Sequence, residues 1–414
     1  MPALARPARL AMPSAATLLL AGLLSACGGG GDASSPATAS ATAMPAPTPT
    51  PPTLAQVGDK LFEDPSLSAS GKLACASCHA EASGHADAAG GFLPLGGADG
   101  THQGLRSSPS LRYLDQAGAF AIDTQGRARG GLFWDGCANS RAEQARGPLF
   151  NPDEMANADV AALAARLRAL PYAADLRASA GLPAAATDDQ LVDAATTALA
   201  RYQAEDAKFH PFTSKFDAVQ DGSATFTAQE QRGLNLFNDP QHGNCASCHD
   251  SRPSPIQAGN TRALFTNFSY HALGAPRNQS QATANPAFFD LGLCGPQRSD
   301  LAGRAELCGQ FRVPTLRNVA LTAPYFHNAS FATLEDVVTF YATRDTDPAR
   351  WYSVVAGQAQ VYDDLPAAYR ANVERGAPFG RPGQPPALSA QDVTDIVAFL
   401  RTLSDGFTAA QPGP

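Results

Sequence analysis

Two identical pentapeptides contain the residues of this 414-residue chain that most clearly indicate a chemical function. Residues 75–79 and residues 245–249 both read Cys-Ala-Ser-Cys-His. In a C-x-x-C-H pattern, two thiols form thioether bonds to the vinyl groups of a haem, and the histidine ligates the iron. One copy alone could also be a zinc half-site or a redox dithiol. The predicted haem-binding residues are Cys75, Cys78 and His79 for the first haem, and Cys245, Cys248 and His249 for the second.

The segments that precede the two pentapeptides are duplicated as well. Residues 58–65 read Gly-x-x-Leu-Phe-x-Asp-Pro, and residues 233–240 have the same pattern. An internal repeat of this kind means that one supersecondary unit is used twice. The duplication therefore favours two covalently bound haem c groups over the zinc and dithiol alternatives.

The methionine count restricts how the second haem iron can be ligated. The four methionines are Met1, Met12, Met44 and Met155, so none lies beyond residue 155. A haem with histidine and methionine ligands has a high reduction potential, and other ligand sets lower it. The second haem cannot take a methionine from its own half of the chain, and its sixth ligand must be histidine, tyrosine or nothing.

Three segments resemble the bacterial di-haem cytochrome c peroxidase/MauG superfamily, and in particular its MauG-like branch. They are residues 61–79, 133–155 and 311–341, and together with the long connections the resemblance covers most of residues 54–405. Phe-Trp-Asp-Gly at 133–136 resembles the motif whose tryptophan lies between the two haems. Gln144, Pro148 and Glu154 match the glutamine, proline and glutamate that line the distal pocket of the peroxide-reacting haem in this family. The catalytic residues implied by this resemblance are Trp134, Gln144, Pro148 and Glu154.

The chemistry gives a reason for these residue types. Bound peroxide must lose a proton from its inner oxygen and gain one on its outer oxygen before the O–O bond breaks. A carboxylate in a partly desolvated pocket can move that proton, and an amide can orient the oxygen. Taken singly, Trp134 could be a core aromatic residue, Glu154 a charge near a helix start and Gln144 a surface amide. Their joint spacing in a chain with two C-x-x-C-H motifs favours the functional reading.

The resemblance also implies a ligand for the second haem. Residues 311–319 and 323–328 match the most recognisable stretch of the family. The alignment places Tyr341 where peroxidases carry a methionine ligand and where MauG-like members carry a tyrosine. The alternative is that Tyr341 is a core aromatic residue. His271 and His327 are weaker candidates for the same position.

A calcium ion is a further expectation from the resemblance. Thr322 and Pro324 match residues whose carbonyl oxygens hold calcium between the haem domains. The third protein ligand of the family is an asparagine, and Ser107 stands in its place, which is a shorter and poorer ligand. His102 lies where some peroxidases carry a histidine that caps the first haem, although a solvent-exposed loop position fits the spacing better. His85 is expected to pack or face solvent rather than to ligate.

The N-terminal residues are expected to direct export. Arg6 and Arg9 precede an apolar stretch, and Leu-Ser-Ala-Cys at residues 24–27 resembles a lipobox in which Cys27 becomes diacylated. Ordinary signal cleavage is the alternative. The apolar stretch is too short to span a bilayer, so acyl chains would hold the protein at a membrane surface. We expect a periplasmic location, with a lipid anchor on a bacterial membrane.

Charge and the other cysteines limit the remaining possibilities. The chain has 30 basic and 38 acidic residues, a net charge of −8. Removal of the signal, which holds two arginines and no acidic residue, leaves a net charge of 28 minus 38, or −10. A chain this acidic lacks the basic surface that binds nucleic acid.

Cys294 and Cys308 flank a short loop, and a disulfide bond between them would stabilise the fold by about 3 kcal/mol. Two separate buried thiols are the alternative, and Cys137 has no obvious partner.

Helix signals dominate the chain. Residues 187–190 and 227–230 read as capping boxes, which predicts that helices begin there, and Asn157, Thr333 and Ser389 precede three further helices. The predicted fold is mainly α, with two cytochrome-c-like haem domains packed together and long irregular connections. The predicted divisions are 1–27, a lipoprotein-type signal peptide; 28–53, a disordered tether; 54–215, the N-terminal haem domain; 216–407, the C-terminal haem domain; and 408–414, a tail.

These features predict a di-haem c-type peroxidase that reduces hydrogen peroxide at the N-terminal haem and shares oxidising equivalents with the C-terminal haem. Its electrons would come from a small cytochrome or cupredoxin. The alternative is a MauG-type oxidase that modifies a protein or organic substrate. A non-catalytic electron-transfer cytochrome fits less well, because it has no need of a peroxide pocket.

Overall fold

The computed structural model describes residues 51–87, 93–257, 260–279 and 287–408. The predicted signal peptide with Cys27, most of the predicted tether and nearly all of the predicted tail lie outside these residues. The described part is mainly helical, as predicted. Its α-helices are α1 (Leu54–Glu63), α2 (Cys75–Cys78), α3 (Arg141–Phe150), α4 (Val160–Ala169), α5 (Ala173–Ser179), α6 (Asp188–Glu205), α7 (Lys215–Gln220), α8 (Ala228–Asn238), α9 (Leu334–Thr343) and α10 (Ala390–Arg401).

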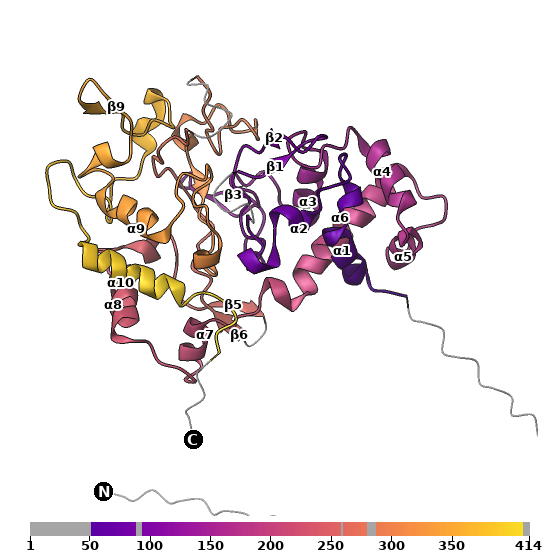
Figure 1. Cartoon of the computed structure of the whole chain (residues 1–414), viewed down its shortest axis with the longest axis horizontal. Helices are drawn as coiled ribbons and strands as arrows, with labels where there is room; N and C mark the ends of the chain where they lie inside the picture. The colour runs from indigo at the N-terminus through magenta and orange to yellow at the C-terminus, as the bar shows by residue number, and fades with distance from the viewer. Residues whose placement is uncertain (1–50, 88–92, 258–259, 280–286, 409–414) are drawn as a thin grey trace, which may run out of the picture. The chain divides into compact units, whose positions relative to one another are not determined.

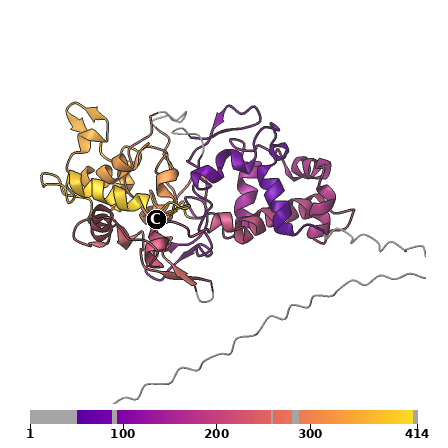
Figure 2. The same cartoon turned by 60° about the horizontal axis from the view of Figure 1, so that its bottom comes forward.

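The first helical group consists of α1 and α3 to α6, which lie together in both views (Figures 1 and 2). Helix α6 is central, because α1, α3 and α4 all pack against it. Gly58 allows α1 to approach α6 closely, since a Cβ atom there would lie 2.0 Å from the carbonyl oxygen of Ala198. The apolar faces of these helices form one core that includes Leu61, Phe62 and Leu199, and this core is adjacent to the first C-x-x-C-H motif.

The second helical group repeats this arrangement with α8, α9 and α10. Helix α8 packs against α10, and α9 contacts α10 as well. Gly233 occupies the position of Gly58 in the sequence repeat, and a Cβ atom there would lie 2.0 Å from the carbonyl oxygen of Asp395. A separate apolar core contains Phe237 and Phe399. The duplicated sequence thus forms the same glycine-mediated helix crossing twice.

Short antiparallel strand pairs connect the helices. Strand pairing is β1 with β2, β3 with β4, β5 with β6, β7 with β8, and β9 with β10. A disulfide joins Cys294 to Cys308, as predicted, while Cys137 is a free thiol. The strands are β1 (Leu95–Gly96), β2 (His102–Gln103), β3 (Ala121–Ile122), β4 (Ala128–Arg129), β5 (Ser254–Gln257), β6 (Asn260–Arg262), β7 (Tyr270–His271), β8 (Phe311–Arg312), β9 (Val354–Val355) and β10 (Gln358–Ala359).

Most of the predicted helix starts agree with the structure. Thr187 and Thr227 form capping boxes at the starts of α6 and α8, and Thr333 and Ser389 cap α9 and α10. The helix predicted after Asn157 is present as α4, which begins at Val160 and has Asp159 as its N-cap. The side chain of Asn157 instead donates hydrogen bonds to the carbonyl oxygens of Leu67 and Leu149, both at 2.8 Å.

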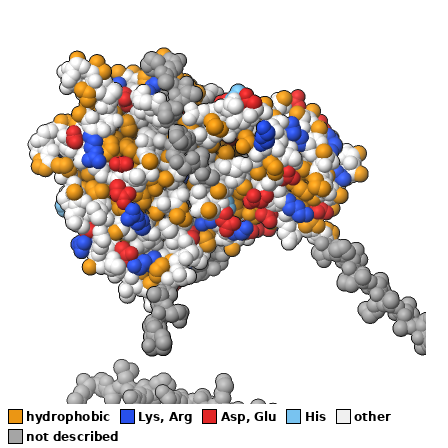
Figure 3. Space-filling model, viewed as in Figure 1, with side chains coloured by type: hydrophobic (Ala, Val, Ile, Leu, Met, Phe, Trp, Pro, Cys, Tyr) orange, Lys and Arg blue, Asp and Glu red, His pale blue; other side chains and the backbone are white. Residues whose placement is uncertain are grey.

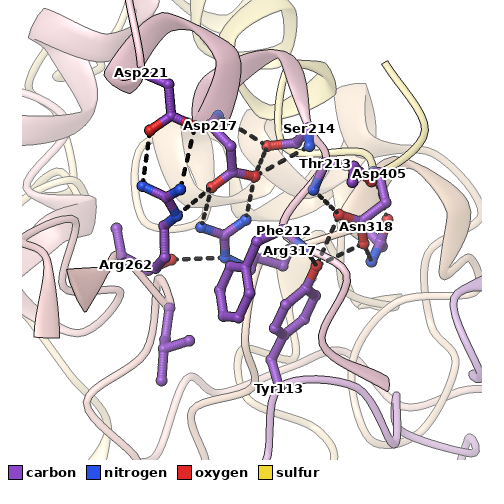
Figure 4. Close-up of polar contacts among 12 residues, drawn as sticks. Tyr113, Phe212, Thr213, Ser214, Asp217, Asp221, Arg262, Arg317, Asn318 and Asp405 are labelled. Carbon is purple, nitrogen blue, oxygen red and sulfur yellow. Dashed lines mark hydrogen bonds and ion pairs between the residues drawn. The ribbon is translucent and has the colours of Figure 1, made fainter. Parts of the chain in front are cut away.

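A buried polar cluster ties distant segments together (Figure 4). The carboxylate of Asp405 accepts hydrogen bonds from the Tyr113 hydroxyl at 2.7 Å and from Asn318 Nδ2 at 2.6 Å. Beside it, the guanidinium of Arg317 makes two hydrogen bonds of 2.9 Å to Asp217. We refer to Tyr113, Asn318 and Asp405 as the Asp405 cluster. It connects the chain end near residue 405 to a loop that follows the first C-x-x-C-H motif.

Acidic and basic side chains are intermixed on the face drawn in Figure 3. Within the described residues, no helix has the length and apolar character that crossing a bilayer requires.

Candidate functional site

The first C-x-x-C-H motif opens onto a cavity of about 460 Å³. Cys75, Cys78 and His79 all line it, and neither cysteine is in a disulfide. Burial lowers the pKa of His79 to about 4, so its imidazole is neutral near pH 7. Its Nδ1 lies 3.0 Å from the carbonyl oxygen of His85, which can only accept a hydrogen bond. Nδ1 therefore carries the proton, and the lone pair of Nε2 is available to a metal.

The four predicted catalytic side chains line this same cavity. Helix α3 carries Gln144 and Pro148, the turn after α3 carries Glu154, and Trp134 comes from the loop before α3. The structure thus brings together residues that are up to 79 positions from Cys75 in the sequence. Carboxyl, amide and indole groups surround a cavity that also contains a histidine and two thiols.

Glu154 is held by its own turn and by the strand pair β1–β2. Asn151 Nδ2 donates a 2.7 Å hydrogen bond to Glu154 Oε1, and the Gly97 N–H donates a 2.7 Å hydrogen bond to the Glu154 carbonyl oxygen. Gly96 is required next to this turn, because a Cβ atom there would lie 2.2 Å from the Asp153 carbonyl oxygen. Burial raises the pKa of Glu154 above its ordinary value despite the hydrogen bond from Asn151. A buried carboxyl group of this kind is suited to accept and return a proton.

Trp134 lies in the wall shared by two cavities. It lines the first cavity and also a second cavity of about 390 Å³. Its Nε1 donates a 2.8 Å hydrogen bond to the carbonyl oxygen of Ser107. The next residue, Asp135, is fully buried and forms an ion pair of 2.7 Å with Arg106. The hydrogen bond to Ser107 and the ion pair of Asp135 therefore fix the indole of Trp134 between the two cavities.

The second C-x-x-C-H motif lines the second cavity together with Tyr341. Cys245 and Cys248 are free thiols there, and His249 Nδ1 lies 3.1 Å from the Phe265 carbonyl oxygen. Burial lowers the pKa of His249 to about 4, so this imidazole is neutral as well. Tyr341, on α9, stacks on Phe379 with ring centroids 5.3 Å apart. Burial raises the pKa of the Tyr341 hydroxyl, which keeps it protonated unless a cation such as a metal ion binds it.

Both cavities fit a covalently attached haem. Each presents two reduced thiols and a neutral histidine in the spacing that thioether attachment requires. The second cavity also has two buried nitrogen atoms without a hydrogen-bond partner among the described residues, Arg312 Nη1 and His327 Nε2. Arg312 Nη1, and His327 Nε2 when it carries the proton, could donate to the carboxylates of a porphyrin.

The predicted calcium ligands are less well placed. Ser107, Thr322 and Pro324 line one cavity, but the Ser107 hydroxyl donates a 2.7 Å hydrogen bond to the Phe326 carbonyl oxygen. In the described part of the chain, no group of three or more histidine, cysteine or acidic side chains forms a metal site. Nothing in this geometry supports calcium.

The other histidines named from the sequence are also placed. His102 is exposed on β2, where its Nδ1 lies 3.2 Å from Asp153 Oδ1, and it does not line the first cavity. His85 is buried and stacks on Phe209 at 4.2 Å. His271 and His327 both line the second cavity, and His327 stacks on Phe311 at 3.5 Å.

Three supporting residues were not identified from sequence. Asn151 holds Glu154; Arg112 donates a 3.0 Å hydrogen bond from Nε to His85 Nδ1; and Arg312 lines both cavities. The only local signal was at Asn151, which starts an Asn-Pro-Asp turn. Arg112 and Arg312 form hydrogen bonds with residues that lie 27 and 179 positions away in the sequence, and no local pattern indicates such contacts.

Comparison with protein families gives one match. Residues 52–225 match the family described as di-haem cytochrome c peroxidase. The methylamine utilization protein MauG of Paracoccus denitrificans is 36% identical over 370 residues, covering 85% of this chain and 88% of that protein. The cytochrome c551 peroxidase of Nitrosomonas europaea is 32% identical over 288 residues, covering 69% of this chain and 71% of that protein.

Solved structures show the same relationship. The chain resembles the crystal structure of the di-haem peroxidase BthA from Burkholderia thailandensis, with a TM-score of 0.78 and 40% sequence identity. The match covers 86% of each chain. It confirms the predicted fold class of two cytochrome-c-like haem domains within a mainly helical chain.

Proposed function

The chain belongs to the di-haem cytochrome c peroxidase family, and from that premise we propose that it reduces hydrogen peroxide in the cavity beside His79. It is a haem oxidoreductase with two c-type haems. The single observation that supports the proposed site is that Trp134, Gln144, Pro148 and Glu154 line the same cavity as His79.

The chain's own residues have distinct roles in this proposal. The haems, when bound, supply the redox chemistry of peroxide reduction and electron transfer. Cys75 and Cys78 would attach the first haem, and Nε2 of His79 would ligate its iron. Glu154 accepts a proton from one peroxide oxygen and returns it to the other, while Asn151 holds its carboxyl group in place. Gln144 orients the peroxide, and Pro148 adds an apolar wall.

The second cavity has a separate role. Cys245, Cys248 and His249 would hold the second haem, and Tyr341 on α9 would supply a further ligand. Trp134, in the shared wall, couples the two sites. Asp135, held by Arg106, fixes the backbone next to this indole.

Tyr341 also favours a second candidate function. A relative that is 36% identical is named methylamine utilization protein MauG. Because no methionine lies beyond residue 155, a second haem held here would have a low reduction potential and would accept electrons poorly from a donor cytochrome. Oxidation of a protein or organic substrate, with peroxide as the oxidant, is therefore the alternative to peroxide removal fed by a small cytochrome or cupredoxin.

A steady-state assay distinguishes these functions. The exported protein, shown by mass spectrometry to carry two haems, would be given peroxide with either a reduced small cytochrome or an organic reductant. Peroxide consumption with either donor is the expected result, and the preferred donor decides between the two functions. A two-haem protein that consumes no peroxide with either donor would contradict the proposal.

Several finer points complete the proposal. We place the haem domains at residues 54–215 and 216–407, in line with the separate apolar cores.

The family is periplasmic. We retain a lipid anchor at Cys27, which metabolic labelling with palmitate would test. Calcium at Ser107, Thr322 and Pro324 remains a prediction from the family resemblance, and metal analysis of the purified protein would settle it.

A further inference from the structure

Arg312 has an unusual position among the buried arginines. It lies on β8 and lines both cavities, as Trp134 does. Its Nε donates a 2.9 Å hydrogen bond to the Phe133 carbonyl oxygen, and its backbone N–H donates a 2.8 Å hydrogen bond to the Trp134 carbonyl oxygen. Arg312 therefore fixes the backbone carbonyl groups of both Phe133 and Trp134.

The charge of Arg312 has no carboxylate partner among the described residues. Its side chain is 5% exposed, and Nη1 has no hydrogen-bond acceptor. By contrast, buried Arg106 pairs with Asp135 and Asp290, and buried Arg317 pairs with Asp217. A buried guanidinium without an anion is strongly unfavourable. The fold therefore implies that an anion from outside the polypeptide completes this site.

The shifted pKa of Arg312 is consistent with a missing anion. Burial lowers the pKa of Arg312, and the charges of Tyr270 and Asp135 only partly oppose this. Arg106 is buried too, but its two carboxylate partners raise its pKa. The two arginines differ in their partners rather than in their depth.

A second buried polar group without a hydrogen-bond partner lies along the same cavity. His327 Nε2 is buried without a hydrogen bond among the described residues, and its nearest carboxylate oxygen, on Asp364, is 3.8 Å away. The ring is held by stacking on Phe311, the residue before Arg312. The Arg312 cation, and His327 in the tautomer that carries its proton on Nε2, can therefore both donate hydrogen bonds into a cavity that already has the features of a haem site.

We propose that Arg312 and His327 bind a propionate of the haem attached at Cys245 and Cys248. The proposal rests on the two-haem assignment above, and not on peroxide turnover. The same guanidinium then binds the second haem through Nη1 and the Phe133 carbonyl through Nε. Arg312 therefore positions Trp134 relative to the haem with which it exchanges electrons.

The reduction potential of the second haem tests this assignment. A buried cation next to a propionate favours the reduced, less positive form of the haem. We expect Arg312→Gln to shift the second haem toward the oxidised form by about tenfold in equilibrium constant, equal to about 59 mV for one electron. Arg312→Lys keeps the charge and should shift the potential less. Each variant would be confirmed to carry two haems by mass spectrometry before spectroelectrochemical titration.

A matched control removes the same charge nearby. Arg298 binds the Asp135 carbonyl oxygen and Asp300 but lines neither cavity, so Arg298→Gln should leave the second haem's potential close to that of the parent protein. Resonance Raman spectroscopy gives an independent readout, because the propionate bending band responds to hydrogen bonding. This band should shift in Arg312→Gln and His327→Phe, and not in Arg298→Gln.

Two results would overturn the proposal. One is an Arg312→Gln variant with both haems attached whose second-haem potential and propionate band match those of the parent protein. The other is a shift confined to the first haem, which would assign the guanidinium to that haem instead. Both readouts are independent of turnover, so an inactive parent protein would refute the peroxidase function without deciding this question.

Discussion

Glu154 combines a buried carboxyl group with a firmly held backbone. Asn151 binds its side chain, while Gly97 binds its carbonyl oxygen. A carboxyl group fixed in this way loses little entropy when it transfers a proton, because its position is already determined. At the residue scale, the site therefore depends on one glutamate and on the turn that carries it.

Glu154→Gln tests its role as a proton carrier. We expect the variant to react with peroxide about tenfold or more slowly, since an amide cannot accept the proton. In the parent protein, burial raises the pKa of Glu154, so the ionised form is lost as pH falls through a value above the ordinary glutamate range. The rate should therefore fall with decreasing pH in the parent protein and lose this dependence in the variant.

Stopped-flow measurement of the peroxide reaction between pH 5 and 8 would record both effects. Glu143→Gln, on the exposed side of α3, is the matched control and should behave as the parent protein does. An unchanged rate in Glu154→Gln would remove this residue from the mechanism.

Tyr341→Phe tests the ligation of the second haem. Phenylalanine can keep the stacking on Phe379 but lacks the oxygen that would bind iron. We expect the optical and EPR spectra of the second haem to change while those of the first haem stay the same. Tyr325→Phe is the control, because Tyr325 lines the same cavity but its hydroxyl donates to the Val319 carbonyl oxygen. Spectra of Tyr341→Phe identical to those of the parent protein would rule out tyrosine ligation.

At the scale of elements, the repeated helix crossing supports both cavities. Helix α8 carries Phe237, which lines the second cavity, and α1 carries Phe62, which lines the first. Each helix reaches its partner through a glycine. The two crossings therefore set the distance between the apolar cores and the C-x-x-C-H motifs.

Gly233→Ala should disrupt this crossing in the second half. The added Cβ atom would lie 2.0 Å from the Asp395 carbonyl oxygen and 2.8 Å from Phe399 Cβ, so α8 must move away from α10. We expect a loss of about 1–3 kcal/mol in the free energy of unfolding, as for other overpacked sites. Gly303→Ala, where an added Cβ atom meets nothing within 4 Å, is the control. Urea unfolding followed by circular dichroism would compare them, and equal stability of the two variants would contradict the close crossing.

Sequence patterns predicted the elements better than the contacts between them. Thr187 and Ser389 were recognised as helix starts because capping depends on neighbours three residues away. The helix after Asn157 was predicted, whereas the hydrogen bond from the Asn157 amide to Leu67, 90 residues away, was not. The side chains predicted from the family resemblance to be catalytic line one cavity, whereas Arg312 was not predicted because its position depends on long-range contacts.

At the scale of the whole molecule, the Asp405 cluster joins the C-terminal segment of the described chain to the loop that contains Arg112 and Tyr113. Asp405 binds Tyr113, and Arg112 Nη1 also lies 3.4 Å from its carboxylate. Arg112 in turn donates to His85, whose carbonyl oxygen lies 3.0 Å from Nδ1 of His79, the proposed haem ligand. A hydrogen-bond chain therefore connects residue 405 to the first haem site.

Asp405→Ala should weaken the whole fold. The substitution leaves the buried Arg112, Tyr113 and Asn318 groups without their acceptor, and removing one partner of a buried ion pair costs about 3–5 kcal/mol. Asp175→Ala breaks the exposed pair with Lys60 and should cost less than about 1 kcal/mol. Thermal unfolding of the two variants would measure the difference. Similar losses in both would mean that the Asp405 cluster adds little to stability.

The cysteines impose an order on how this chain can be made. Cys294 and Cys308 must be oxidised to each other, whereas the four thiols of the C-x-x-C-H motifs must stay reduced until porphyrin is attached. An oxidant strong enough to close the first pair can also close either C-x-x-C pair, and a closed pair cannot be haemylated. Biogenesis therefore requires an oxidising compartment that also contains a dedicated thiol reductant, and heterologous expression lacking either activity should yield apoprotein or mispaired protein.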